Sequence, residues 1–379
     1  MENNNSVCFV AKISEIKPIP GADNIELGII GGWNCIIKKG DHRVDELVIC
    51  ATTDAVIPVE LSDAMNVTNY LRKGGRVKTV KLKGVYSECL IIPFKYANVS
   101  TKSDLVEGSD VMEILGIYKY EPPAVQVQLS SGKKIRYHQN PNFHVYYKFP
   151  NIKNVPGIFN EDDEVQITRK LHGTNSRYGI VKKNKLSFWD KVKRFLWLNN
   201  EWDEYEYVYG SHNVEKGSDS QGFYSTDVWR KVAEDYRIKE SLWEFVKENY
   251  TPEELGSGLT VYGEIFGPGI QKNYDYGLQS LAFNVFDITL NGKYQHTLYV
   301  ELFCNESIGS FVHVPILYEG KWSQAEQDKW TFNNFIGDTK VPHEGIVIKA
   351  IDGKRAKIAK VINPDYTIWS EKHDVGDSH

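Results

Sequence analysis

The amino-terminal third of the chain consists of short apolar runs that turn residues interrupt. From Val7 to about Pro123, runs of four to seven residues are bounded by Gly, Asp and Pro. Such runs are typical of β-strands, and five or six of them within about 90 residues favour a small Greek-key β-barrel. The runs read VCFVAKI, ELGIIGG, WNCIIKKG, ELVICA, VKTVKLKG and ECLIIPF.

One segment of this region is strongly basic, with six cations and no acid in twelve residues. On a strand, Arg76 would share a face with Lys78, and Lys81 with Lys83. An edge strand protected by lysines against aggregation is one interpretation. A groove that follows the phosphates of a nucleic acid is the other, and it makes the whole set candidate nucleic-acid-binding residues. The set is Arg72, Lys73, Arg76, Lys78, Lys81 and Lys83.

A stretch rich in Pro, Ser and Gly, from Glu121 to Lys134, predicts a linker or surface loop. We therefore expect two domains, residues 1–122 and 123–379. The sequence that follows the linker, as far as Phe149, mixes lysines and arginine with tyrosines. This mixture suits base stacking on nucleic acid, and it equally suits buried aromatic residues beside surface lysines.

The remaining chain predicts an α+β domain of about 250 residues built on antiparallel sheets. Helical spacing of apolar residues is clearest from Asp227 to Tyr250 and weaker from Trp322 to Phe335. A basic amphipathic helix is possible from Ser187 to Asn200, where it could face nucleic acid, a partner or the domain core. The runs that predict strands are VQITRKL, RYGIVKK, LTVYGEI, LAFNVFDI, GIVIKA and AKIAKVI.

Composition restricts the location of the protein and its partners. The chain has 45 Lys and Arg against 50 Asp and Glu, which excludes a uniformly basic coat but permits a local anion site. No stretch approaches the roughly 20 apolar residues that cross a bilayer, and the first residues do not resemble an export signal. Five scattered cysteines without metal-binding spacing favour a reducing compartment. We expect a soluble intracellular protein, cytoplasmic or nuclear, with no membrane partner.

The chemistry-bearing pattern begins with a lysine before a tight turn, in ITRKLHGTN around Lys170. Alone it is a weak signal, because strands often end in a lysine and a glycine turn. It gains weight from five segments that follow in order. They are VYGSHN, YGEIFGPGIQK, FNVFDI, HEGIVIK and AKIAKVIN.

In this order, the segments resemble the nucleotidyltransferase motifs that ATP-dependent ligases and RNA capping enzymes share. KLHGTN with GEIFGPGIQ is similar to the RNA ligases in particular. The stretches EIKPIPGADNIELGIIGGWNCIIKKGD, VKLKGVYSECLIIP and GSDVMEILGIYKYEPP resemble the OB-like module of the fifth RNA-ligase family. The resemblance implies an amino-terminal OB-like β-barrel followed by an antiparallel-sheet nucleotidyltransferase domain with peripheral helices.

The resemblance also implies an activity, that of an ATP-dependent RNA ligase. Such an enzyme forms a lysyl-AMP intermediate, transfers AMP to an RNA 5′-phosphate, and lets a 3′-hydroxyl displace the AMP. We expect it to require ATP and Mg²⁺ or Mn²⁺, and to act as a monomer on RNA or an RNA-containing duplex. Nicks whose 3′-OH strand is RNA are the expected substrate.

Roles for individual residues follow from the resemblance. Lys170 would be the nucleophile, and because a free lysine has a pKa of about 10.4 it needs neighbouring cations or a metal to lose its proton. Glu264 would contact ribose or a metal-bound water, Glu344 would hold the metal, and Asp287 would orient a neighbouring group. Phe286 would stack on adenine. The nucleotide-binding set is Arg169, His172, Gly173, Asn175, His212, Glu264, Phe286, Lys349, Lys357 and Lys360.

Three positions depart from the pattern of the RNA ligases. Arg169 stands beside the nucleophile where many of these enzymes have a glutamate, and His212 stands where arginine is common. The last motif usually has lysines separated by one residue, whereas two residues separate Lys357 from Lys360. We expect Lys360 to be the α-phosphate contact.

Two alternatives remain open from the sequence. A GTP-dependent guanylyltransferase of the capping type would use the same lysine chemistry. A catalytically inactive relative that only binds nucleic acid would explain Arg169 and the shifted lysine pair.

Overall fold

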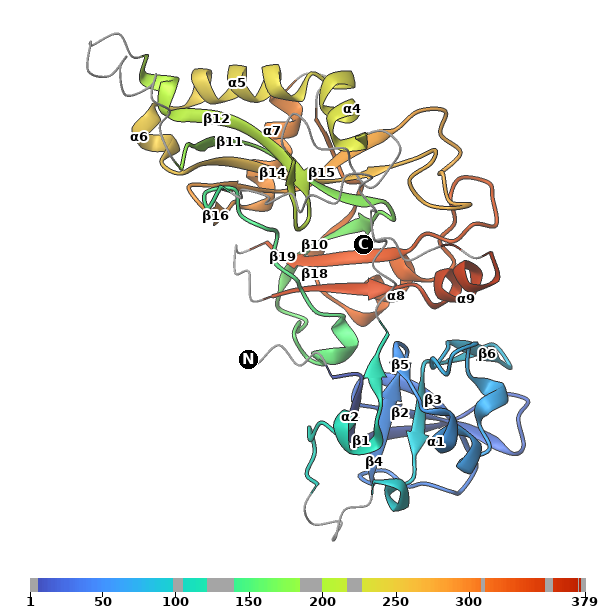
Figure 1. Cartoon of the computed structure of the whole chain (residues 1–379). Helices are drawn as coiled ribbons and strands as arrows, with labels where there is room; N and C mark the ends of the chain where they lie inside the picture. Colours follow the sequence, from blue (N-terminus) through green and yellow to red (C-terminus); the bar gives the residue numbers. More distant parts are fainter. Residues whose placement is uncertain are drawn as a thin grey trace, which may run out of the picture. The chain divides into compact units, whose positions relative to one another are not determined.

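The computed structural model describes residues 6–97, 105–120, 140–184, 200–216, 227–307, 311–351, 357–373 and 375. These residues form two compact units, and each is described by itself (Figure 1). The first unit holds the described residues up to 120 together with Pro150–Ile158, and the second holds the others. The expected boundary after residue 122 lies outside the described residues.

The first unit is built around a five-stranded sheet in the order β3-β2-β1-β4-β8. Its long central strand pairs with β4 through its first half and with β2 through its second half. Apolar side chains on both sides of this strand are buried, in two separate clusters. The elements are β1 (Cys8–Pro18), β2 (Ile25–Ile30), β3 (Trp33–Lys38), β4 (Leu47–Thr52), β5 (Ala55–Val56), α1 (Val59–Ala64), η1 (Thr68–Tyr70), β6 (Val80–Leu82), β7 (Val85–Ser87), β8 (Cys89–Ile92), η2 (Phe94–Tyr96), α2 (Met112–Leu115), β9 (Tyr118–Lys119) and η4 (Ile152–Asn154).

The basic segment of this unit is less regular than the predicted strand. Arg76 and Lys78 do share a side, because they alternate with buried neighbours. The prediction that Lys81 and Lys83 share a strand face is wrong. Lys83 and Gly84 form the two-residue turn between β6 and β7, and Lys83 has a φ of 51°. Turns of this kind require positive φ values, so the strand ends before Lys83.

The second unit contains two antiparallel sheets, as predicted. One follows the order β13-β12-β11-β14-β15-β16, with β17 parallel to β15, and the other the order β18-β10-β19-β20. The strands are β10 (Glu164–Lys170), β11 (Thr174–Lys182), β12 (Tyr205–Ser211), β13 (Glu215–Lys216), β14 (Gly258–Phe266), β15 (Ala282–Leu290), β16 (Lys293–Tyr294), β17 (Val312–His313), β18 (Ile316–Lys321), β19 (Gly345–Ala350) and β20 (Ile358–Ile362).

The helices of the second unit lie at the periphery of the sheets. In Figure 1, α4 and α5 lie along β11 and β12, where their apolar faces join the largest buried cluster. The stretch 227–250 is two helices rather than one, because Arg237 adopts a left-handed conformation between them. The helical elements are η5 (Glu201–Glu204), α4 (Val228–Asp235), α5 (Ile238–Asn249), α6 (Pro252–Leu255), α7 (Thr297–Glu306), α8 (Gln324–Thr331) and α9 (Pro364–Lys372).

In the second unit, the helices α6, α7 and α9 were not predicted. The amino-terminal end of α9 is specified locally, since the Asn363 side chain caps it and Pro364 occupies its first turn. The expected basic helix at 187–200 lies outside the described residues except for Asn200. Within the described part of the chain, no helix is long and apolar enough to span a membrane.

Candidate active site

Lys170 is the last residue of β10, and its side chain shares a sheet face with two other predicted site lysines. Residues that pair directly across an antiparallel ladder point to the same side. Lys170 pairs with Gly345, while Thr168 pairs with Val347, which pairs with Lys360. Lys349 lies two residues beyond Val347 on the same strand. The four-stranded sheet therefore places Lys170, Lys349 and Lys360 on one face.

The Lys170 amine is held by a carboxylate. Its Nζ lies 2.6 Å from Oε1 of Glu344, the residue that directly precedes β19. The other oxygen of this carboxylate, Oε2, is buried without a hydrogen-bond partner among the described residues and lies 3.7 Å from Nδ1 of His172. The structure thus brings together the predicted nucleophile and a predicted metal ligand that is 174 residues away in sequence.

Glu264 completes this group from the other sheet. It lies on β14 opposite Asn175 of β11, so both side chains share a face. Burial raises the pKa of the Glu264 carboxyl to about 8, the charge of Glu344 adds to the rise, and the Lys170 ammonium opposes it. Oδ1 of Asn175 is buried and has no hydrogen-bond partner in the described part of the chain. His212 follows β12 directly, beside the Asn175 end of β11.

The turn after Lys170 is fixed by contacts that sequence reasoning missed. The Gln271 side chain donates to the Gly173 carbonyl at 2.6 Å, and the His172 backbone N–H donates to the Tyr276 hydroxyl at 2.6 Å. A Cβ on Gly173 would lie 2.2 Å from the Ile265 carbonyl oxygen, so only glycine fits. Gln271 ends the segment GEIFGPGIQ, but nothing in that segment marks it as the partner of the turn.

Lys349 is buried against Phe286 and Asp287. Its Nζ donates to the Phe286 carbonyl at 2.5 Å and lies 3.4 Å from Oδ2 of Asp287, which is fully buried. Tyr146, from the stretch of mixed lysines and tyrosines, is buried, which is the second of the two interpretations given to that stretch. It donates to the same carboxylate at 2.9 Å, and its ring centre lies 4.9 Å from that of Phe286. The β14–β15 ladder is irregular here, because Tyr262 pairs with Asp287 and the next pair skips Phe286.

Lys357 lies away from this group. Its Nζ is 2.5 Å from Oδ1 of Asp163, the residue before β10 begins. Because Lys170 ends that strand, the two lysines are separated by nearly its whole length, about 20 Å at 3.3 Å per residue. Lys360, by contrast, lies level with Thr168 on the face of Lys170.

Arg169 is also separated from Lys170, although the two are adjacent in sequence. Side chains alternate along β10, so Arg169 points to the opposite face. Its guanidinium donates to Asn334 at 3.1 Å, and burial lowers its pKa. Burial also lowers the pKa of the neighbouring His343 to about 4, and the Arg169 charge acts in the same direction.

The carboxylates fit a divalent cation. Glu344 presents a buried oxygen with no hydrogen-bond partner in the described ranges, and Glu264 is a carboxylate whose charged form burial disfavours. Carboxylate oxygens are the protein ligands that Mg²⁺ prefers, and Mg²⁺ usually keeps one or two of them beside water and phosphate oxygens. Among the described residues, no group of three or more His, Cys, Asp and Glu side chains is arranged so that it could hold a metal ion, so substrate phosphates and water would complete the coordination.

The basic residues of the first unit form several local contacts. Arg76 forms an ion pair with Asp54, and its guanidinium lies 4.1 Å from the centre of the Tyr120 ring. Lys81 donates to the Tyr86 hydroxyl at 2.7 Å and lies above the same ring. Two of the cations thus lie beside aromatic rings. Lys73, Lys81 and Lys83 are exposed, whereas Arg72, Arg76 and Lys78 are half-buried.

Comparisons with known proteins give one matching family model in each unit. The family model described as RNA ligase matches residues 163–362, and a model described as an OB-fold domain matches residues 7–94. None of the curated proteins compared with the chain matches it. The predicted OB-like module is thereby confirmed.

Solved structures of an RNA ligase from Naegleria gruberi are similar over almost the whole chain. A variant with ATP and Mn is 23% identical, covers 97% of this chain and 99% of its own, and has a TM-score of 0.69. A variant with AMP and Mn is 24% identical with the same coverage and a TM-score of 0.70, and the enzyme with pyrophosphate has 24% and 0.68. At this identity the similarity establishes the fold, and it confirms the predicted nucleotidyltransferase domain.

Proposed function

The chain belongs to the RNA ligase family, and we propose that it joins RNA 3′-OH and 5′-phosphate ends with ATP through an AMP adduct of Lys170. The observation that carries the proposal is the position of the Lys170 amine. It lies at a strand end, 2.6 Å from Glu344, on the sheet face that also carries Lys349 and Lys360. The ATP and AMP complexes of the similar Naegleria enzyme support ATP as the nucleotide.

The first step requires an uncharged amine. Lys170 would attack the α-phosphorus of ATP, so that an N–P bond forms and the bond to the leaving pyrophosphate breaks. The ammonium must first lose a proton and separate from Glu344, whose Oε1 is at hydrogen-bond distance and could accept it. Lys360 and Lys349 would neutralise phosphate charge, and Asn175 and Phe286 would contact the sugar and the base.

The turn that Gln271 and Tyr276 hold would keep the amine in place during attack. A reacting group held in one geometry gains much of its rate from orientation alone. Glu344 and Glu264 would hold Mg²⁺ or Mn²⁺. The bound cation would stabilise charge on the phosphate oxygens.

The first unit would bind the RNA. Its support is the set of cations from Arg72 to Lys83 beside the rings of Tyr86 and Tyr120. Cations that meet phosphates and rings that meet bases are the two requirements of single-strand binding.

We further propose a monomer with two domains that works inside the cell. The five cysteines are buried free thiols, as expected in a reducing compartment.

Labelling with ATP or GTP carrying a radioactive α-phosphate tests the proposal. We expect ATP with Mg²⁺ to label the wild type, and Lys170→Ala to abolish labelling while the protein still unfolds cooperatively. Lys293→Ala, which removes an exposed lysine of β16, is the control and should label normally. The labelled enzyme should pass AMP to a nicked duplex with an RNA 3′-OH strand. A labelled Lys170→Ala protein, or preferential labelling by GTP, would overturn the proposal.

A further inference from the structure

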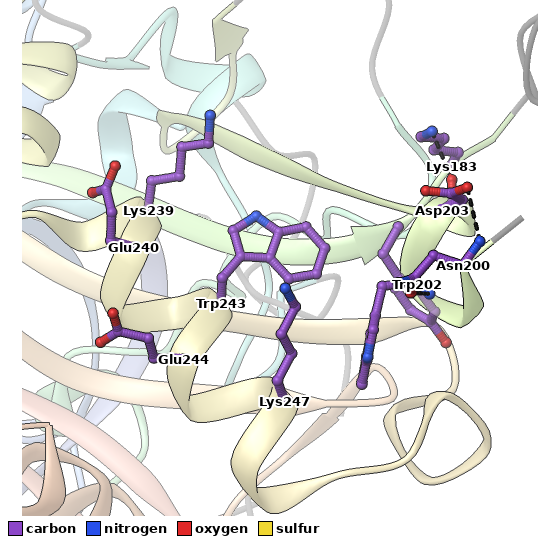
Figure 2. A pocket seen from close by; sticks show the side chains of 10 residues that line it. Lys183, Asn200, Trp202, Asp203, Lys239, Glu240, Trp243, Glu244 and Lys247 are labelled. Carbon is purple, nitrogen blue, oxygen red and sulfur yellow. Dashed lines mark hydrogen bonds between the residues drawn. The ribbon is translucent and has the colours of Figure 1, made fainter.

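A groove of about 570 Å³ lies on the second unit, lined by residues around Trp202 and Trp243 (Figure 2). It lies at the opposite end of β11 from Lys170. Thr174 begins β11 beside the candidate active site, and Lys183, which follows the strand, lines the groove. Eight residue steps along the strand span about 26 Å. The groove is therefore a separate feature, and its volume is within the range of small-molecule sites.

Two tryptophans form the apolar part of the groove. The rings of Trp202 and Trp243 lie 6.3 Å apart with an interplanar angle of 83°, and both are only partly buried against the core of the unit. Neither indole N–H forms a hydrogen bond to any described residue, and neither is among the buried polar atoms without partners. A planar ligand could thus contact indole surface and accept a hydrogen bond at the same place.

Lysines flank one of these rings along a single stripe of α5. Lys239, Trp243 and Lys247 recur every four residues, so they share a helix face, with the two lysines about 12 Å apart along the axis. The Lys247 ammonium lies 5.3 Å from the centre of the Trp243 ring. Neither lysine forms an ion pair with another described residue. The adjacent α4 does so twice, between Arg230 and Glu234 and between Lys231 and Asp235.

The acids of the groove are directed elsewhere. In Figure 2, the carboxylates of Glu240 and Glu244 point away from the side of α5 that carries the Trp243 indole. Asp203 accepts from the Asn200 backbone N–H in a capping box, and its main-chain carbonyl accepts from Lys183 at 2.7 Å. Lys239 and Lys247, which form no ion pair within the described part of the chain, therefore share a face of α5 with the partly buried Trp243 indole.

We propose that this groove binds a nucleotide segment of the RNA substrate, about eight nucleotides from the joining site. The inference rests on the proposed function, because it takes RNA as the substrate. A base stacks on aromatic rings regardless of its sequence, and lysines neutralise the adjoining phosphates. At 3.4 Å per nucleotide of a stacked strand, the 26 Å separation corresponds to about eight nucleotides, and the lysine pair spans three to four.

The test compares two double variants of equal charge. Lys239→Ala/Lys247→Ala alters the groove, and Lys293→Ala/Lys321→Ala removes two exposed lysines from other strands of the unit. Binding of nicked duplexes whose RNA strand continues as an unpaired arm of 6 or 14 nucleotides is measured over a range of salt concentrations, because only unpaired bases can stack on the groove. We expect the groove variant to bind the 14-nucleotide substrate more weakly, with a salt slope reduced by about 1.4. The 6-nucleotide substrate and the control variant should show no such change.

Trp243→Ala should weaken binding of the long substrate by about fivefold to a hundredfold, and Trp243→Phe should restore most of it. Labelling of Lys170 without RNA should be normal in all variants, which shows that the unit is folded. Absence of labelling in the wild type would refute the proposed ligase chemistry, while RNA binding would still test the groove. Unchanged binding of the long substrate by the lysine variant would overturn the inference. The inference would also be overturned if the lysine variant bound RNA like the wild type but lost affinity for an acidic peptide that contains aromatic residues.

Discussion

The buried pair of Lys349 and Asp287 gives the sharpest test of how the candidate site is built. The Lys349 side chain is 7% exposed and that of Asp287 is fully buried, with their charged atoms 3.4 Å apart. Lys349→Met removes the cation and leaves the carboxylate fully buried. Breaking a buried pair from one side costs about 3 to 5 kcal/mol. For a unit of this size that corresponds to a fall in Tm of about 6 to 20 °C.

Asp287→Asn removes the charge that the first substitution isolates. The double variant should therefore regain much of the lost stability, a coupling that a double-mutant cycle measures. Because we propose that Lys349 also neutralises phosphate, the double variant should still fail to form labelled lysyl-AMP. Thermal unfolding by circular dichroism and labelling with ATP are the two assays, and Lys293→Met is the surface control. A Lys349→Met protein that melts like the wild type would refute the buried pair. Normal labelling of the double variant would refute the phosphate role.

Three further predictions concern the surroundings of Lys170. Burial raises the pKa of Glu264 to about 8, so the folded protein retains a proton that the unfolded chain loses above about pH 4.5. The wild type therefore loses stability as the pH rises from 4.5 to 8. In metal-free melts, the Tm of Glu264→Gln should rise relative to that of the wild type across this range. A Tm difference that does not change with pH would contradict the raised pKa. Gln271→Leu removes the hydrogen bond to Gly173, which should cost about 1 kcal/mol of stability and slow single-turnover labelling, and unchanged labelling would argue against a positioning role. Arg169→Met should leave the preference for ATP over GTP unchanged, because the guanidinium points to the other sheet face; competition labelling that shifts toward GTP would return Arg169 to the nucleotide site.

The sequence predicted the strands of both units well, because their apolar runs are short and bounded by turn residues. It also predicted that Lys170 and Glu344 belong to one site, but only through the order of the motifs. Their contact depends on the pairing of β10 with β19, which joins residues far apart in the chain. No local pattern specifies that pairing. The same limit explains why the partners of Tyr146 and Gln271 were not predicted, since they are 141 and 98 residues away.

Adjacency in sequence was misleading at two positions. Arg169 stands next to Lys170, yet strand alternation places it on the other face of the sheet. Lys83 extends a basic run, yet a left-handed turn residue ends the strand there. In both cases the backbone conformation at a single residue decides where the charged side chain points. The amino-acid composition of the segment does not reveal that conformation.

The ion pairs of Lys170, Lys349 and Lys357 indicate a different role for each lysine. A face with several unpaired lysines would repel itself in the absence of phosphate, and internal carboxylates reduce that repulsion. Lys170 is paired at a strand end with a quarter of its side chain exposed, so its amine can leave Glu344 when a nucleotide arrives. Lys349 is held by the Phe286 carbonyl and Asp287, so it acts as a charge fixed in advance, which needs no reorganisation when charge develops on phosphorus. Lys357 is paired with Asp163 at the other end of β10, about 20 Å from the nucleophile, and contacts neither Lys170 nor Glu344 in the described structure. Of Lys170 and Lys349, the partly exposed amine is thus the one that must form a bond, and the buried one supplies a fixed charge.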